Sequence, residues 1–106
     1  MHEFKDYDTI QLRIGDIFHT LWVADTDAKR QRGLRGVSKL SKGNGMIFAY
    51  NTPVRHPFTM NGVGIPLRMI FVDDAHQVVH SETCYPGRQE SVTPDSDYMY
   101  VIEIGA

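Results

Sequence analysis

The amino-acid sequence predicts a mostly β domain, and three observations support this prediction. Apolar and polar residues alternate with a period of two along most of the chain, which is the period of a half-buried strand. Glycine, proline, asparagine and aspartate gather between the alternating runs, where turns are expected. Only one segment, near residues 26–34, has the composition of a helix. We therefore expect an all-β or α+β domain, a small barrel or sandwich of about seven strands with one short helix.

A β-hairpin is predicted near the start of the chain. Residues 9–14 alternate, so their isoleucine and leucine side chains share one face. Gly15-Asp16 is a two-residue turn signal with glycine first, and residues 17–24 return from it. We expect these two strands to pair antiparallel.

The predicted helix begins after Asp25 or Thr26, because either side chain can accept a hydrogen bond from the first helical turn. Its body, residues 28–32, consists of fair to good helix formers. Gly33 or Gly36 is expected to end it, since glycine adopts the backbone conformation found at helix ends.

Strands are expected to resume after the glycine-rich turn at residues 42–45. Pro53 and Pro57 predict an edge or irregular strand over residues 55–61, because proline donates no hydrogen bond to a ladder. Residues 66–72 are nearly all apolar, as in a strand that is buried on both faces.

The last part of the chain is predicted to contain a hairpin, a long loop and a final strand. Residues 73–76 favour a turn, from which residues 77–83 return. Residues 84–97 show no alternation and predict a long loop, and loops of this length tend to be functional or disordered. Residues 98–104 are the last strand, on which every second residue from Tyr98 onward shares a face.

The chain has 106 residues, which is the size of one domain, and we expect a single domain over residues 1–106. The net charge is −2, so a globally basic nucleic-acid-binding domain is excluded. Cys84 is the only cysteine, so no disulfide can form within the chain. The sequence shows no apolar stretch of membrane-helix length and no signal peptide at its start. We expect a soluble protein.

Short blocks in a fixed order carry a family resemblance. They are Val23-Ala24-Asp25-Thr26, Arg32-Gly33-Leu34, Gly45-Met46-Ile47-Phe48, Phe58-Thr59-Met60-Asn61, Ile65-Pro66-Leu67 with Ile70-Phe71-Val72-Asp73, and Val101-Ile102-Glu103-Ile104. Over residues 17–104 they resemble the domain-of-unknown-function 192 family of small bacterial, archaeal and phage proteins. The resemblance implies a compact, mostly β fold and no particular activity. The expected location is cytoplasmic, since no signal peptide or membrane-helix stretch is seen, or virion-associated, since the family has phage members.

Three positions depart from the usual pattern of that family. Val37 stands at or next to a usual arginine, Thr59 stands at a usual tryptophan, and Arg68 stands at a usual aspartate. If the arginine and the aspartate form a functional pair in the family, this chain lacks that pair.

The sequence contains no recognisable motif for catalysis or metal binding. His80 and Glu82 share a strand face but need a third metal ligand, and the other histidines show no zinc-binding spacing. Cys84 lies at a predicted strand end, where nothing nearby favours a thiolate. Neither a Gly-x-Ser-x-Gly elbow nor a phosphate-binding loop before a helix occurs. We therefore predict no catalytic residue, no metal ion and no cofactor.

Six basic residues and no acidic residue lie between positions 29 and 42, which suggests a docking surface for an acidic protein partner. No aromatic residue interleaves with them, so nucleic acid is disfavoured as a partner. A solvated helix face and loop is the more ordinary interpretation of this basic run, and docking is the sharper hypothesis. A sheet edge or the loop 84–97 could also bind a protein. The candidate partner-binding residues are Lys29, Arg30, Arg32, Arg35, Lys39 and Lys42.

A pocket for a small ligand is the second candidate site. Arg68 interrupts an apolar strand, where a charge must be paired or must face solvent. Its side chain could point outward, reach a carboxylate such as Glu82 or Glu103, or hold an anionic ligand. The candidate ligand-binding residues are Arg55, His56, Phe58, Met60 and Arg68.

These observations favour a non-catalytic interaction or accessory module, which could belong to a larger assembly such as a virion. A small-ligand-binding β-barrel that uses Arg68 and the strand carrying Phe58 and Met60 is the alternative. An enzyme of unknown reaction is the third class and the least favoured.

Overall fold

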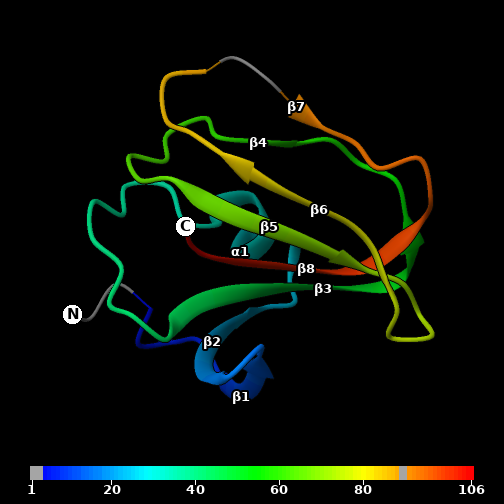
Figure 1. Ribbon diagram of the computed structural model, residues 1–106, viewed down its shortest axis with the longest axis horizontal. Coiled ribbons are helices and arrows are strands. Elements are labelled where there is room, and N and C mark those ends of the chain that lie inside the picture. The colour runs from blue at the N-terminus through cyan, green and yellow to red at the C-terminus, as the bar shows by residue number, and fades with distance from the viewer. Residues whose placement is uncertain (1–3, 89–90) are drawn as a thin grey trace.

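The computed structural model describes residues 4–88 and 91–106 as a mostly β fold with two sheets (Figure 1). The strands of the main sheet are β1 Thr9–Ile14, β2 Ile17–Ala24, β3 Asn44–Val54, β5 Leu67–Val72, β6 Val78–Cys84 and β8 Tyr98–Gly105. They lie in the order β1-β2-β3-β8-β5-β6. A small second sheet pairs β4 (Phe58–Thr59) with β7 (Ser91–Val92), and the helix α1 spans Asp27–Arg32.

The predicted fold class is confirmed, but the prediction of a barrel is wrong because the main sheet is open. Within the described residues β1 pairs only with β2 and β6 pairs only with β5, so the sheet has two free edges. Neighbouring strands pair antiparallel except β2 and β3, which run parallel. The connection between β2 and β3 carries α1 across one face, and this layer buries the face without closing the sheet.

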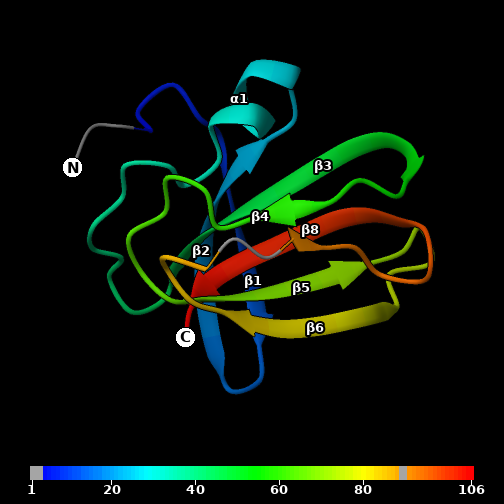
Figure 2. The ribbon, with the colours of Figure 1, turned by 90° about the horizontal axis from the view of Figure 1, so that it is seen from above.

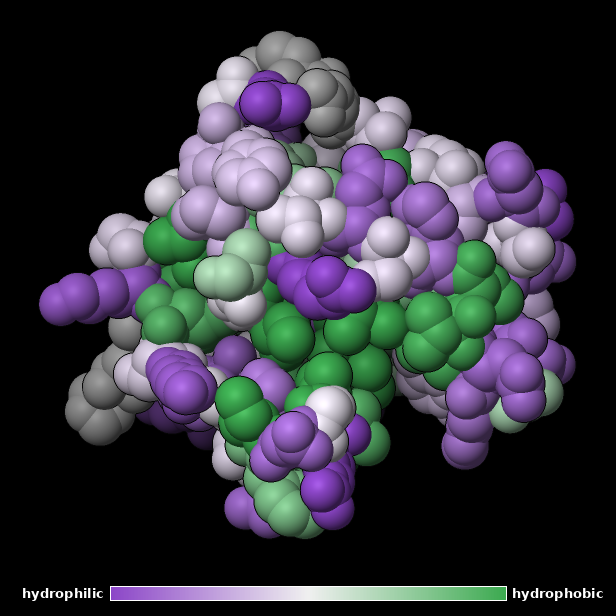
Figure 3. Space-filling model, viewed as in Figure 1, coloured by the Kyte–Doolittle hydropathy of each residue, from purple (hydrophilic) through white to green (hydrophobic). Residues whose placement is uncertain are grey.

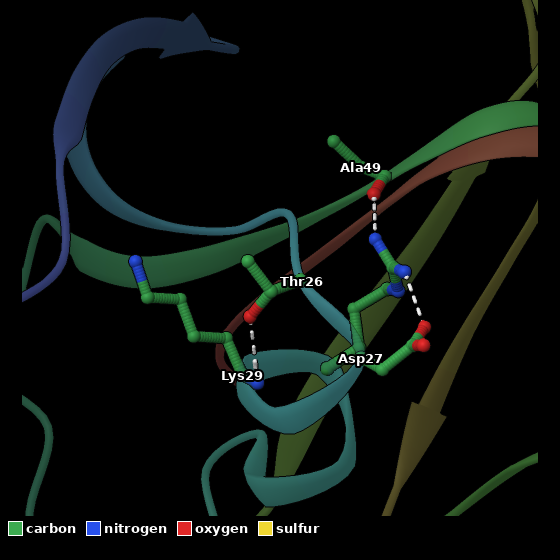
Figure 4. Close-up of polar contacts among 5 residues, drawn as sticks. Thr26, Asp27, Lys29 and Ala49 are labelled. Atoms are coloured by element: carbon green, nitrogen blue, oxygen red, sulfur yellow. Dashed lines mark hydrogen bonds and ion pairs between the residues drawn. The ribbon is translucent and has the colours of Figure 1, made fainter.

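The predicted hairpin and helix are both confirmed. In the tight turn between β1 and β2, Gly15 has the positive φ of +62° that glycine readily adopts. Thr26 caps α1, because its Oγ1 accepts a hydrogen bond from the backbone N–H of Lys29 at 3.2 Å (Figure 4). Gly33 ends the helix and donates its N–H to the carbonyl oxygen of Lys29. No helix in residues 4–88 or 91–106 is long and apolar enough to span a membrane.

The main sheet has two different faces. Figure 2 shows α1 on one side of the sheet and the turn of the β1–β2 hairpin on the other. The large core lies on the α1 side, where Phe58 of the small sheet packs against Phe48 and Phe71. We call the opposite side the open face. It carries a smaller apolar cluster of Leu21, Ile70, Ile102 and Ile104.

The central strand β8 sends alternate side chains to the two faces. Ile102 and Ile104 point to the open face, whereas Val101 belongs to the core on the α1 side. Glu103 shares this α1 side, opposite Met46 of β3 and Met69 of β5. A carboxyl group is therefore held among apolar strands.

The alternation of β8 does not extend to Tyr98. The sequence places Tyr98 on the face of Ile102, but Tyr98 is fully buried in the core on the α1 side. The pairing of β3 with β8 shifts register between Ala49 and Val54. Between these pairs β3 advances five residues while β8 advances two, so the ladder is interrupted at the start of β8, and the alternation of the regular pairing does not carry over to Tyr98.

The predicted loop 84–97 contains strand pairing that its sequence did not indicate. Cys84 is the last residue of β6, and within the segment Val92 of β7 pairs with Phe58 of β4. Residues 89 and 90 lie outside the described residues. The segment therefore covers part of the core, where Val92 is buried.

Candidate small-ligand site

A cavity of about 200 Å³ lies beside α1, above the sheet and next to the small second sheet. We call it the Glu103 cavity, after the residue of β8 at its buried side. Its lining combines three arginines, one carboxyl group and three aromatic rings. The lining residues are Arg30, Gln31, Arg32, Gly33, Leu34, Arg35, Phe48, Tyr50, Pro57, Phe58, Thr59, Asn61, Val63 and Glu103.

Glu103 is the buried acidic group of the cavity. Its place in the middle of the sheet leaves the residue only 3% exposed. Burial raises the pKa of its carboxyl group from 4.5 to about 8, so the group is mostly protonated at neutral pH. Among the described residues no ion pair or side-chain hydrogen bond involves its carboxyl group, whose oxygens are not among the fully enclosed polar atoms and therefore reach the cavity. Buried polar groups usually have a partner, and the cavity is the direction from which one can come.

Arg30 forms the helix side of the cavity and is held in place by three contacts. Its Nη1 donates to the carbonyl oxygen of Ala49 at 2.7 Å, and its Nη2 donates to Oδ1 of Asp27 at 2.7 Å (Figure 4). Its guanidinium carbon lies 4.9 Å from the centre of the Tyr50 ring. Burial also raises the pKa of the Tyr50 hydroxyl, which the nearby Arg30 partly opposes. These contacts tie α1 to β3.

Arg32 and Arg35 complete the basic side of the cavity. The Arg32 guanidinium lies 4.6 Å from the centre of the Phe4 ring. Arg35 is exposed beside Gly62, where a Cβ would come within 3.2 Å of its Cγ. Gly36 donates its N–H to the carbonyl oxygen of Gly62 at 2.9 Å, which joins the two segments around the cavity. Among the described residues Arg35 forms no ion pair, so its charge remains available at the opening.

Aromatic rings form the remaining wall. Phe58 packs edge-on against Phe48 and Phe71, with ring centres 5.1 and 5.7 Å apart. The Tyr98 hydroxyl fixes the segment before Phe58, because it donates to the carbonyl oxygen of His56 at 2.6 Å and accepts from the His56 N–H at 3.0 Å. Thr59 follows as an exposed residue of the lining.

The structure separates the five ligand-binding residues that the sequence suggested. Phe58 lines the Glu103 cavity, and Met60 is buried in the core. Arg55 forms an exposed ion pair, 3.0 Å long, with a carboxylate of the segment before β8. His56 has its backbone held as described above and is outside the lining. Arg68 is exposed on β5, on the open face.

Glu103 is the residue that sequence reasoning missed as a site of its own. In the sequence it figures only as one carboxylate that Arg68 could reach. The signal for a separate role is a carboxyl group inside the otherwise apolar run Val101–Ile104. Such a group must be paired, protonated or in contact with a ligand.

The six suggested partner-binding residues divide between two places. The three arginines line the Glu103 cavity. Lys29 lies over the Tyr7 ring, with its Nζ 4.9 Å from the ring centre. Lys39 and Lys42 are exposed beyond the helix. The basic segment is therefore part cavity wall and part exposed surface.

The open face carries a second, larger hollow of about 620 Å³. Its lining comes from β1, β3, β5, β6, β8 and the turns after β1 and β5, and most of its side chains are apolar. Figure 3 shows hydrophobic side chains gathered across the middle of this face. Its polar side chains are those of Arg13, His76 and Tyr100. No buried charged group faces this hollow within the described residues.

No group of three or more His, Cys, Asp and Glu side chains is placed to hold a metal ion in the described ranges. His80 and Glu82 form a two-residue pair, with Nε2 and Oε1 2.9 Å apart. Cys84 is buried.

The fold and the cavity define a small, mostly β domain with an open sheet and a polar cavity beside its helix. The model of the DUF192 family, described as "Uncharacterized ACR", matches residues 10–106, and the chain belongs to this family. The resemblance seen in the sequence is thereby confirmed. No curated protein matches the chain.

Two solved structures share the fold. One is a protein of unknown function from Novosphingobium aromaticivorans DSM 12444, with a TM-score of 0.81 and 25% identity, over 94% of this chain and 74% of that chain. The other, from Sinorhizobium meliloti 1021, is described as a "putative transcription regulator". It has a TM-score of 0.79 and 21% identity, over 94% of this chain and 82% of that chain. The second likeness shows the fold alone.

Proposed function

We propose that this chain is a small-ligand-binding domain and that the Glu103 cavity is its site. One observation supports this proposal above all: a buried carboxyl group, with no partner among the described residues, borders a cavity that opens to solvent. Small-ligand binding is one of the alternatives that the sequence leaves open. The proposal keeps Phe58 from the residues expected there and replaces Arg68 by Glu103 as the polar anchor.

The cost of burying Glu103 supports a ligand. An enclosed polar group without a hydrogen bond costs about 1–3 kcal/mol, which is the upper bound for Glu103 because its oxygens reach the cavity. Its cross-strand neighbours Met46 and Met69 are fully buried, so a methionine at position 103 suits the same surroundings without that cost. A ligand that hydrogen-bonds to the carboxyl group offsets the cost when it binds.

The size of the cavity limits the ligand. A cavity of roughly 150 Å³ in another protein holds one benzene molecule. The Glu103 cavity, at about 200 Å³, has room for a somewhat larger molecule. We therefore expect a ligand with on the order of ten non-hydrogen atoms inside the cavity.

The proposal is tested by filling the cavity. Thr59→Trp adds a large ring at an exposed position of the lining, outside the buried core. Thr9→Trp makes the same change at an exposed position of β1, outside the cavity. We expect some members of a panel of small carboxylates, amines, amino acids and polyols to raise the Tm of the wild-type and Thr9→Trp proteins but not of Thr59→Trp. If every shift persists in Thr59→Trp, the cavity is not the site.

Docking of an acidic protein on the basic segment is the second candidate function. The observation that favours it is the exposure of Lys39 and Lys42 in a stretch without acidic residues. Native mass spectrometry of protein purified gently from its own source tests this function. A co-purifying chain that is lost after Lys39→Glu with Lys42→Glu supports docking, and one that is retained at low salt contradicts it.

A further inference from the structure

The inner and outer parts of the Glu103 cavity carry different charged groups. Glu103 lies at the buried side, and Arg35 is exposed at the opening. Arg30 and Arg32 also line the cavity, but Arg30 is bonded to Ala49 and Asp27, and Arg32 lies against Phe4. In the described part of the chain, an acid inside and a cation at the opening are therefore left to meet a ligand.

We infer that the ligand is a small zwitterion whose ammonium group binds at Glu103 and whose carboxylate, or similar small anionic group, binds at Arg35. This inference rests on the proposed function, because it names the chemical class of ligand for the same cavity.

An ammonium group suits the buried side of the cavity. Phe48, Tyr50 and Phe58 line the cavity together with Glu103, and aromatic rings attract cations. The Tyr50 ring already contacts a cation, since the guanidinium carbon of Arg30 lies 4.9 Å from the ring centre. An ammonium group also forms charge-assisted hydrogen bonds with a carboxylate, and these are stronger than the bonds of a neutral group.

An anionic group suits the opening. A simple amine entering the cavity meets the exposed charge of Arg35, which repels it. A carboxylate matches the planar fork of a guanidinium group and can bind Arg35 through two hydrogen bonds. One molecule with both groups satisfies the two parts of the cavity at once.

Binding of an ammonium group also releases a proton. The Glu103 carboxyl group is mostly protonated in the free protein and must ionise to pair with the ammonium group. The other charged or titratable groups of the lining are the three arginines and Tyr50, and burial raises the pKa of the Tyr50 hydroxyl further above neutral. A neutral ligand that only hydrogen-bonds to Glu103 leaves the proton in place.

Isothermal titration calorimetry of the wild-type protein near pH 7 tests the inference. The probes are unbranched ω-amino acids from glycine to aminohexanoate, with butyrate and butylamine as controls that each lack one charged group. We expect one chain length to bind best and both controls to bind at least about tenfold more weakly. Titrations in two buffers with different ionisation enthalpies are expected to show close to one proton released per bound amino acid.

Three variants assign the two ends of the ligand. Glu103→Gln is expected to bind the best amino acid no more tightly than butyrate and to release no proton. Arg35→Gln is expected to bind it no more tightly than butylamine. Lys5→Gln removes an exposed charge outside the cavity and is expected to leave all affinities unchanged.

Three results overturn the inference: butyrate binds as tightly as the best amino acid, no proton is released, or no member of the series binds. All three results come from titrations of the wild-type protein, so they do not depend on whether a variant folds. The proposed function is judged separately. It stands if another small compound binds the wild-type protein but not Thr59→Trp, and it fails if none does.

Discussion

Replacing Glu103 by glutamine is expected to stabilise the protein by an amount that grows with pH. The carboxyl group ionises near pH 4.5 in the unfolded chain, whereas burial raises its pKa to about 8 in the folded protein. Between these values only the unfolded chain gains the free energy of ionisation, so the wild-type protein loses stability as the pH rises. Glutamine is neutral in both states, and the Glu103→Gln variant avoids this loss.

The size of the effect follows from the difference between the two pKa values, 4.5 and about 8. One pKa unit corresponds to about 1.4 kcal/mol. Through Glu103 alone, the wild-type protein therefore loses on the order of 5 kcal/mol of unfolding free energy across this pH range. The total free energy of unfolding of a native protein is about 5–15 kcal/mol, so this loss is a large fraction of it. At and below pH 4.5 the carboxyl group is largely protonated in both states, so its ionisation adds little to the difference in unfolding free energy between the wild-type protein and Glu103→Gln.

Urea denaturation, followed by the fluorescence of Trp22, measures this difference at several pH values between 4.5 and 8. Asp74→Asn removes an exposed carboxylate and serves as the matched control. We expect the gap between Glu103→Gln and the wild-type protein to widen with pH, while the control shows no comparable trend. A gap that stays constant over the range contradicts the assignment of Glu103 as a buried group without a partner.

Three further substitutions test the fold. Thr26→Ala removes the cap of α1 and is expected to lower the unfolding free energy by about 1 kcal/mol in urea denaturation, with no change if the cap is unimportant. Gly45→Ala directs a Cβ against the backbone carbonyl of Glu103, so we expect a loss on the order of 3 kcal/mol in thermal unfolding. A wild-type Tm contradicts that packing. Tyr98→Phe removes both hydrogen bonds to the His56 backbone and is expected to cost about 1–2 kcal/mol and to speed hydrogen exchange of the His56 amide. Unchanged exchange contradicts the contact.

The local structure of the chain could be predicted because its signals are local. A glycine at position 15 indicates the first hairpin, and Thr26 with Gly33 indicates both ends of α1. The prediction of a closed barrel was wrong because alternation shows which segments are strands but not which strands pair with each other. The parallel pairing of β2 with β3 and the bulge before Tyr98 depend on contacts between distant segments, which a period of two does not show.

The candidate site could be predicted only in part. Phe58 was expected to contact a ligand, and it lines the cavity. Glu103 and the arginines of residues 30–35 are far apart in the sequence, and they line one cavity because β8 lies next to β3. The anchor of Arg30 is the backbone carbonyl of Ala49, and side-chain patterns carry no information about such a partner.

The place of β8 in the sheet bears on how the chain folds. β8 is the last strand in the sequence, yet it lies between β3 and β5 in the sheet. Without β8 the main sheet divides into two pieces, β1-β2-β3 and the β5–β6 hairpin, and each piece has an unpaired edge where β8 belongs. Such edges pair readily with other chains, which is a route to aggregation. Since β8 also carries Glu103, a ligand of the cavity binds only after insertion and thereby shifts the balance from aggregation towards the folded protein.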